Sequence, residues 1–309
     1  MNTAAKLSAY GAALVLVAGG GWAIGGAAGP VAASSGAPAA AHSDTHDAAG
    51  PAGAATGLPG GLASSLNGYT LVPSTTTLPT GTTQPFTFRV LGPDGAPVTA
   101  YDVEHEKRMH LIVVRRDTAG FQHLHPQLAA DGSWWIQLGL PQAGSYRMYA
   151  DFKPTGGQAT TLGVDLSTPG DYQPAWYPPA RESEVDGYRV RLDGDLVAGR
   201  SSSVRLTVTK DGREVTDLEP YLGAYGHLVA LRGGDLAYLH VHPDESATAG
   251  PTIDFHTEVP SPGTYRLFLD FQHGGEVRTA EFTVEAQGTA PAAPAPAAEG
   301  DGHGHSHGG

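Results

Sequence analysis

The residues of this chain best suited to chemistry are two triplets of histidine with identical spacing. They are His110, His123 and His125 in one stretch, and His227, His240 and His242 in another. In each triplet a step of thirteen residues is followed by a step of two, and a proline follows the last histidine. Imidazole is a frequent ligand of late transition metals because its lone pair is free near neutral pH. The spacing therefore predicts a nitrogen-rich metal site in each repeat.

A hairpin is expected to bring the histidines of one repeat together. Gly233-Gly234 suits a two-residue turn, since both central positions of such a turn need positive φ. If Arg232 pairs with Asp235 across this turn, His227 lies directly opposite His240. The corresponding stretch of the first repeat, RRDTAG, has no glycine pair, so its turn can be longer.

All three histidines of a repeat are expected on one face of the hairpin, because side chains alternate across a strand. An even-numbered loop keeps them there, whereas an odd-numbered loop or a bulge separates them. Apolar residues share that face, which leaves open the alternative of core-edge histidines hydrogen-bonded to backbone. These residues are Ile112, Val114 and Phe121 in the first repeat, and Val229, Leu231 and Tyr238 in the second.

A third strand can supply another ligand to each site. The segments GSYRMYADF and GTYRLFLDF match each other, alternate as strands do, and carry Asp151 and Asp270 near their ends. Each aspartate is expected to bind the metal or to orient a histidine that does. The alternative is an aspartate that caps a turn or pairs with Arg147 or Arg266.

The first repeat offers one further candidate ligand, His105, which precedes His110 by five residues and is flanked by Glu104 and Glu106. The second repeat has Leu222 at the matching place. Metal binding by His105 is therefore expected to be specific to the first domain.

Composition restricts the donor set. The chain has no cysteine, which excludes blue-copper centres, thiolate zinc sites, iron–sulfur clusters and a cysteine nucleophile. A copper ion is the expected cofactor and zinc the alternative, because imidazole-rich sites suit both and the divalent series favours copper. Neither an HExxH nor a GxSxG motif occurs. No catalytic residue is assigned, and the protein is not expected to be an enzyme.

The amino-terminal segment indicates export. Lys6 is followed by an uncharged, apolar run to about Ala33, long enough to cross a hydrocarbon layer of ~30 Å as a helix. Residues 1–33 are therefore expected to be a signal peptide or a plasma-membrane anchor, with the rest of the chain extracytoplasmic or secreted. The formal net charge of -13 argues against nucleic acid as a partner and suits a surface that attracts cations.

Two low-complexity segments flank the central part of the chain. Residues 34–63 are rich in alanine, glycine, serine and proline, and are expected to be a flexible linker. Residues 288–309 are expected to be a disordered tail, whose His303, His305 and His307 can chelate copper, nickel or zinc loosely.

Between these segments the sequence predicts an all-β protein. Short alternating runs separated by glycine, proline and aspartate indicate two tandem immunoglobulin-like antiparallel β-sandwiches, over residues 64–168 and 184–287. A proline-rich linker joins them over residues 169–183, and its Trp176 and Tyr177 are expected to pack between the domains.

Two blocks of sequence carry a family resemblance. HEKRMHLIVVRRDTAGFQHLHP and LEPYLGAYGHLVALRGGDLAYLHVHP resemble exported, membrane-anchored bacterial proteins of an actinobacterial type, described as heavy-metal-binding or YtkA-like. The resemblance covers nearly the whole chain and is specific in the two histidine blocks. It implies extracytoplasmic handling of copper or a similar metal, often alongside a membrane metal transporter such as a P-type ATPase.

The sequence leaves two candidate functions. The main hypothesis is an extracytoplasmic metal-binding protein that buffers, senses or delivers copper at the cell surface. The alternative is a structural or adhesive tandem immunoglobulin-like surface protein, in which the HxHP motifs stabilise a strand end through imidazole hydrogen bonds.

Overall fold

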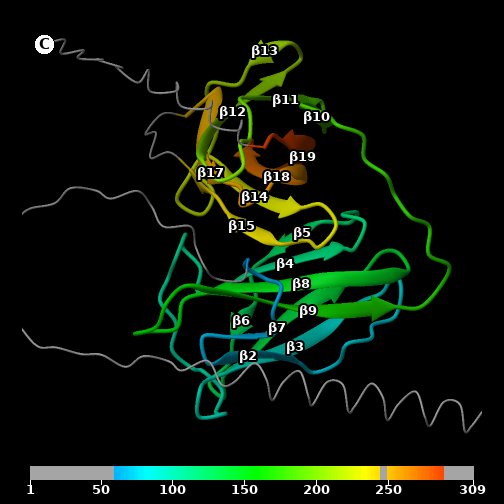
Figure 1. Ribbon diagram of the computed structural model, residues 1–309, viewed down its shortest axis with the longest axis vertical. Coiled ribbons are helices and arrows are strands. Elements are labelled where there is room, and N and C mark those ends of the chain that lie inside the picture. Colours follow the sequence, from blue (N-terminus) through cyan, green and yellow to red (C-terminus); the bar gives the residue numbers. More distant parts are fainter. Residues whose placement is uncertain (1–58, 244–248, 289–309) are drawn as a thin grey trace, which may run out of the picture. The chain divides into compact units, whose positions relative to one another are not determined.

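The computed structural model describes residues 59–243 and 249–288, and all regular elements within these ranges are β-strands (Figure 1). The expected anchor at residues 1–33 and the tail with His303, His305 and His307 lie outside the described residues. The side chains of His240 and His242 also lie outside the description, although their backbone belongs to strands. Over the ranges that are described, no helix is long and apolar enough to cross a membrane.

The first sandwich consists of two antiparallel sheets. One has the order β1-β2-β3-β7-β6, with bounds Ser65–Leu66, Tyr69–Pro73, Thr83–Leu91, Ser133–Gly139 and Gln127–Leu128. The other has the order β5-β4-β8-β9, with bounds Gln122–Leu124, His110–Arg115, Gly144–Phe152 and Thr160–Thr168. Alternation in β3 shows why the sheets pair: Phe86 and Phe88 enter the core, while Thr87 between them is exposed.

The second sandwich repeats this plan. Its first sheet has the order β10-β11-β12-β17-β16, with bounds Glu182–Val185, Tyr188–Asp193, Ser201–Lys210, Thr252–Glu258 and His242–Pro243. The short strand β13 (Arg213–Glu214) also pairs with β12. Its other sheet has the order β15-β14-β18-β19, with bounds Tyr238–His240, His227–Arg232, Gly263–His273 and Glu276–Ala286.

Strand order identifies both sandwiches as immunoglobulin-like. In the first, β2-β3-β7-β6 follow the order A-B-E-D and β5-β4-β8-β9 the order C′-C-F-G, and the second sandwich has the same two series. A tyrosine corner supports this assignment in each copy. The hydroxyl of Tyr146 donates to the carbonyl of Gln142 at 2.8 Å, and that of Tyr265 donates to the carbonyl of Ser261 at 2.8 Å. The predicted all-β class with two sandwiches is confirmed.

A third apolar cluster, here called the joint cluster, connects the two sandwiches. The rings of Phe121 and Phe268 stack within it, with centroids 4.0 Å apart. Strand β4 is buried along its whole length, because one face packs in its own sandwich and the other packs in the joint cluster. The cluster consists of Ile112, Val114, Tyr149, Val229, Leu231, Leu236, Tyr238 and Phe268, with Phe121 packed against them.

The end of the expected amino-terminal linker is not free. The N–H of Gly61 donates to the carbonyl of Thr161, and the guanidinium of Arg147 donates to the carbonyls of Gly61 and Leu62. Gly60 forms a β-bridge with Tyr238 of the second sandwich. Residues 60–63 are therefore ordered against both sandwiches, because a buried arginine needs acceptors and their carbonyls provide them.

The linker between the sandwiches differs from expectation at one aromatic residue. Trp176 does not pack between the domains, since 81% of its surface is exposed. Tyr177 does make a domain contact, because the guanidinium of Arg266 lies 3.9 Å from its ring centroid. Residues 171–179 have no regular structure, as their prolines predict.

Candidate metal centre

The hairpin of the second repeat has a different register from the predicted one. Its loop spans residues 233–236, because the N–H of Arg232 donates to the carbonyl of Ala237 and that of Leu236 to the carbonyl of Arg232. His240 therefore lies opposite Val229 and not opposite His227. The predicted two-residue turn is wrong because the loop extends to bury Leu236 in the joint cluster. The shift is two residues, so the predicted face is unchanged.

The first repeat reaches the equivalent register by another route. The N–H of Arg115 donates to the carbonyl of Ala119, which closes a three-residue loop. An odd loop alone would reverse the faces, but one extra residue around Gly120, with φ of 62°, restores them. Val113 then pairs with Gln122, and Ile112 with His123.

The three histidines of the first repeat converge. Each of His110, His123 and His125 offers a ring nitrogen, and these atoms all lie within 4.8 Å of one another. Nδ1 of His110 is 3.1 Å from Nε2 of His123. Nε2 of His125 is shielded from solvent and has no hydrogen-bond partner among the described residues. A buried nitrogen without a partner destabilises a fold by about 1–3 kcal/mol unless a ligand satisfies it.

The contacts on the far side of each ring fix the tautomers of His110 and His123. Nε2 of His110 lies 3.1 Å from the carbonyl oxygen of Glu104, which can only accept, so this nitrogen carries the proton. Nδ1 of His123 lies 2.7 Å from a carboxylate oxygen of Asp270 and carries the proton for the same reason. When both rings are neutral, the two nitrogens that face each other at 3.1 Å therefore both present lone pairs. This arrangement is repulsive without a cation between them.

Asp270 orients a histidine of the other sandwich. Its carboxylate is 3% exposed, and its second oxygen accepts a hydrogen bond from the hydroxyl of Thr279 at 2.5 Å. Asp270 pairs in register with His227 on its own sandwich but reaches His123 on the first. A carboxylate behind a metal-binding imidazole fixes the ring and raises its basicity.

Asp151 occupies the matching register position in the first sandwich, opposite His110. It accepts hydrogen bonds from Thr161 at 2.8 Å and from Tyr238 of the second sandwich at 3.5 Å. The alternative of pairing with the strand's own arginine is wrong for both aspartates. Arg147 binds Asp165 and backbone carbonyls, and Arg266 binds Glu281 and Thr283.

Burial keeps the imidazoles of His110, His125 and His227 neutral. Desolvation lowers the pKa of His110 to about 4, that of His125 to about 3 and that of His227 to about 4. The neighbouring histidines lower these pKa values further, since like charges disfavour protonation. Neutral imidazole is the form that binds metal.

Two further histidines extend the cluster across the joint. His105 lies with its ring centroid 6.1 Å from that of His110 and 5.4 Å from that of His227. Nε2 of His227 donates to the carbonyl of Tyr221 at 2.8 Å, as Nε2 of His110 does to Glu104. Residues of the two separately predicted sites therefore lie in one group. This group, here called the histidine cluster, consists of the imidazoles of His105, His110, His123, His125 and His227.

For His240 and His242, the predicted ligands of the second repeat, the structure describes only the backbone. His240 lies on β15, and His242 pairs with His256 at the edge of the other sheet. Spacing within the repeats did not indicate the contacts of the cluster across the joint, which are those of His123 with Asp270 and of His105 with His227. A signal existed in HLIVV and HLVAL, which are apolar at nearly every position and so need packing partners on both faces.

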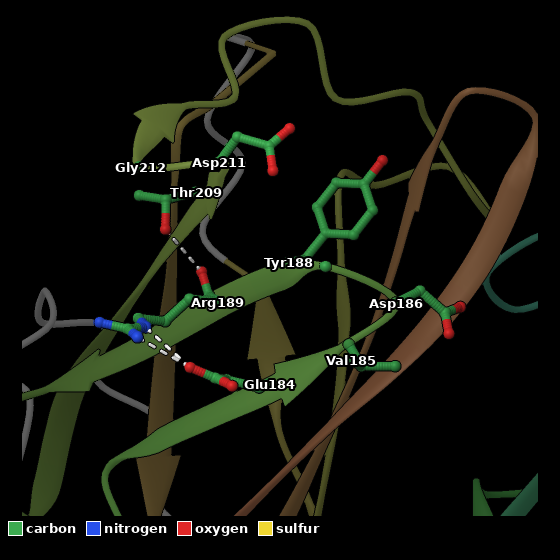
Figure 2. A pocket seen from close by; sticks show the side chains of 9 residues that line it. Glu184, Val185, Asp186, Tyr188, Arg189, Thr209, Asp211 and Gly212 are labelled. Carbon is green, nitrogen blue, oxygen red and sulfur yellow. Dashed lines mark hydrogen bonds and ion pairs between the residues drawn. The ribbon is translucent and has the colours of Figure 1, made fainter.

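The second sandwich has a cavity away from the histidine cluster. It has a volume of about 430 Å³ and shares no residue with the histidine cluster. Figure 2 shows Arg189 and Glu184 pointing toward each other across a salt bridge of 2.8 Å, with the carboxylate of Asp186 pointing away from them. The charged side chains that line this cavity do not point toward one another as a group, whereas the ring nitrogens of His110, His123 and His125 do.

A protein-family model matches residues 64–170 and 183–288, which correspond to the two sandwiches. The chain belongs to this family, a domain of unknown function named DUF8832. Each DUF8832 domain carries one histidine triplet. No curated protein matches the chain.

Solved structures similar to this pair of DUF8832 domains include an adhesin, intimin and an integrin-binding protein. The Escherichia coli adhesin FdeC matches at 15% identity and a TM-score of 0.25, over 74% of this chain and 66% of FdeC. The D00-D0 domain of intimin matches at 12% identity and a TM-score of 0.23, over 71% and 99%. Invasin, a bacterial integrin-binding protein, matches at 13% identity and a TM-score of 0.22, over 70% and 39%. The fold assignment rests on strand order and not on these scores.

Proposed function

We propose that this protein binds a late transition-metal ion through His110, His123 and His125. Copper is the ion proposed and zinc the alternative, because an all-nitrogen donor set suits both. The single observation that carries the proposal is the 3.1 Å separation of Nδ1 of His110 from Nε2 of His123, since the other nitrogen of each ring is bound elsewhere. Two imidazoles bound at 2.0–2.1 Å to one tetrahedral ion have nitrogens about 3.3 Å apart.

Charge supports a cation at this place. The buried carboxylate of Asp270 receives its hydrogen bonds from His123 and Thr279, and both donors are neutral groups when the imidazole is neutral. A buried carboxylate without a nearby positive charge is strongly unfavourable. An ion held by the three histidines offsets this charge through His123.

The proposed role is extracytoplasmic binding and not catalysis. The expected amino-terminal anchor or signal peptide and the resemblance to heavy-metal-binding, YtkA-like proteins support a place at the cell surface. There the protein is proposed to buffer, sense or deliver copper, with a membrane metal transporter such as a P-type ATPase as the partner.

The second candidate function is that of a structural or adhesive surface protein. The observation in its favour is that FdeC is an adhesin and that invasin binds integrin. In that case the imidazoles serve only to connect strands and sandwiches. The two candidates differ in one measurable property, which is stoichiometric metal binding.

The test uses the full chain with His303, His305 and His307 replaced by alanine, so that the tail binds no metal. Cu(II) and Zn(II) are titrated against a competing chelator. His125→Ala is expected to weaken binding by roughly tenfold or more, about 1.4 kcal/mol or more. The matched control is His273→Ala, because His273 is an imidazole bonded to Tyr188 and Asp217 away from the cluster. Equal binding by both variants would leave the adhesive or structural function as the better proposal.

A further inference from the structure

The histidine cluster contains a pair of imidazoles that the triad does not use. We propose that a second cation position lies between His105 of the first sandwich and His227 of the second. The inference rests on the proposed function, since both positions take the same class of late transition-metal ion. The second position differs from the first because each sandwich supplies one ligand, so the ion itself connects the two domains.

Ring separations distinguish the two positions. Within the triad the ring centroids are 4.8, 5.2 and 5.3 Å apart. His105 and His227 fall in the same range at 5.4 Å, with their ring planes at 81°. An imidazole bound at 2.0–2.1 Å has its ring centre about 3.2 Å from the ion, so two rings on one ion are about 5.2 Å apart in a tetrahedral site and at most about 6.4 Å apart. His123 and His227, at 6.5 Å, are too far apart to share an ion.

The donor atom of His227 is set by the backbone. Its Nε2 donates to the carbonyl of Tyr221 at 2.8 Å, which leaves the lone pair on Nδ1. His110 is held in the same way by the carbonyl of Glu104. In both sandwiches a backbone carbonyl therefore binds Nε2 of the histidine and leaves the lone pair of Nδ1 for a metal ion.

A turn places His105 at the joint. The residues Glu104 and Lys107 exchange both backbone hydrogen bonds, at 2.9 and 3.1 Å, around His105 and Glu106. Both central residues have positive φ, 47° and 61°, which defines a type I′ turn. The second repeat has Leu222 and Gly223 in the same turn, with φ of 55° and 81°. The turn itself does not require a histidine, since leucine occupies the equivalent position.

Space for an ion exists beside this pair. A small cavity of about 30 Å³ is lined by His105, His227, His110, His123 and Asp151, among others. A volume of roughly 10–15 Å³ holds one water molecule, so an ion and a water ligand fit. Two imidazoles suit Cu(I), which accepts low coordination numbers, and copper is already the ion proposed for the triad.

The experiment counts copper ions in the full chain that lacks the three tail histidines. Cu(I) is added anaerobically with a competing chelator, and bound copper is measured per chain after desalting. His105→Leu is the test variant, because Leu222 shows that leucine fits this turn. Glu106→Gly is the matched control, since it copies Gly223 and leaves His105 in place. Circular dichroism checks the fold, and His105→Asn, which tolerates positive φ, is the second variant.

The expected result is that His105→Leu loses one copper ion per chain while Glu106→Gly loses none. His125→Ala should lose a different ion, so the double variant loses two. The inference is overturned if His105→Leu keeps the parental copper number and affinity. It is also overturned if His105→Leu and His125→Ala remove the same single ion. Failure of the proposed function is seen separately, as unchanged binding in His125→Ala.

Discussion

Nδ1 of His123 in the first sandwich lies 2.7 Å from Oδ2 of Asp270 in the second, and both side chains are almost completely buried. One domain therefore carries the candidate ligand and the other carries the group that orients it. The proposed metal binding would be linked to the packing of the two sandwiches through this contact.

Asp270→Asn is expected to weaken metal binding by roughly 10- to 100-fold, although it removes no ligand. The amide cannot supply the negative charge that makes His123 a stronger donor. A chelator-competition titration measures the change. Asp254→Asn is the control, since Asp254 makes a surface pair with Arg205 on the same sandwich. An effect of less than twofold for Asp270→Asn contradicts the orienting role.

Phe121→Ala is expected to lower the free energy of unfolding by about 2–4 kcal/mol and to weaken metal binding at the same time. The substitution removes the ring that stacks on Phe268 in the joint cluster, so Asp270 is held less firmly against His123. Urea denaturation and metal titration measure the two effects. Trp176→Ala removes an aromatic ring that is 81% exposed and should change stability by no more than about 0.5 kcal/mol. Comparable losses in both variants would argue against the joint cluster.

Asp117 is expected to stabilise the fold above about pH 4 and to lose this effect in acid. Burial alone raises its pKa, but hydrogen bonds from Arg115 and from the N–H groups of Ala175 and Ala119 outweigh burial and lower it. A carboxyl whose pKa is lower in the folded state stabilises above the unfolded pKa of about 3.9, and the stabilisation disappears as the pH falls through the folded value.

Asp117→Asn should therefore cost about 2–3 kcal/mol at pH 7, and the difference from the parent should shrink below about pH 4. Urea denaturation at several pH values tests this. Asp131→Asn is the control, because the pair of Asp131 with Arg89 is exposed, and it should have the smaller effect. A difference that stays constant down to pH 2 would show that the Asp117 carboxylate is not the cause.

Metal is expected to stabilise the folded protein. At 100 times the dissociation constant, Zn(II) should raise the free energy of unfolding by about 2.7 kcal/mol, provided that the unfolded chain does not bind it. EDTA should reverse the increase. His125→Ala, in the background without tail histidines, should show a much smaller response. A response of equal size in that variant would place the stabilising ion elsewhere.

The residue pattern of the two repeats made much of the fold predictable. Alternation in segments such as FTFRV and the paired glycine and tyrosine positions indicate strands of sandwiches, and the structure has them. The common face of His110, His123 and His125 agrees with alternation, because the odd-numbered loop and the extra residue around Gly120 cancel each other. Turn lengths were less predictable, since burial of Leu236 at the joint determines one of them.

The meeting of the two triplets could not be derived from spacing within a repeat. Ile112 and Val229 shared the histidine face in the sequence and suggested ordinary core-edge histidines. They instead form the joint cluster and bring His227 toward His123. Which residues of one domain face another depends on packing between surfaces distant in sequence, and alternation within a strand carries no information about it.

Two contacts hold the chain at residues 60–62. Gly60 forms a β-bridge with Tyr238, and Arg147 donates hydrogen bonds to the carbonyls of Gly61 and Leu62. Tension applied to the chain ahead of residue 60 acts first on the seam between the domains and not on either hydrophobic core. A pull from that end would therefore act first on the contacts of residues 60–62 with Thr161, Arg147 and Tyr238.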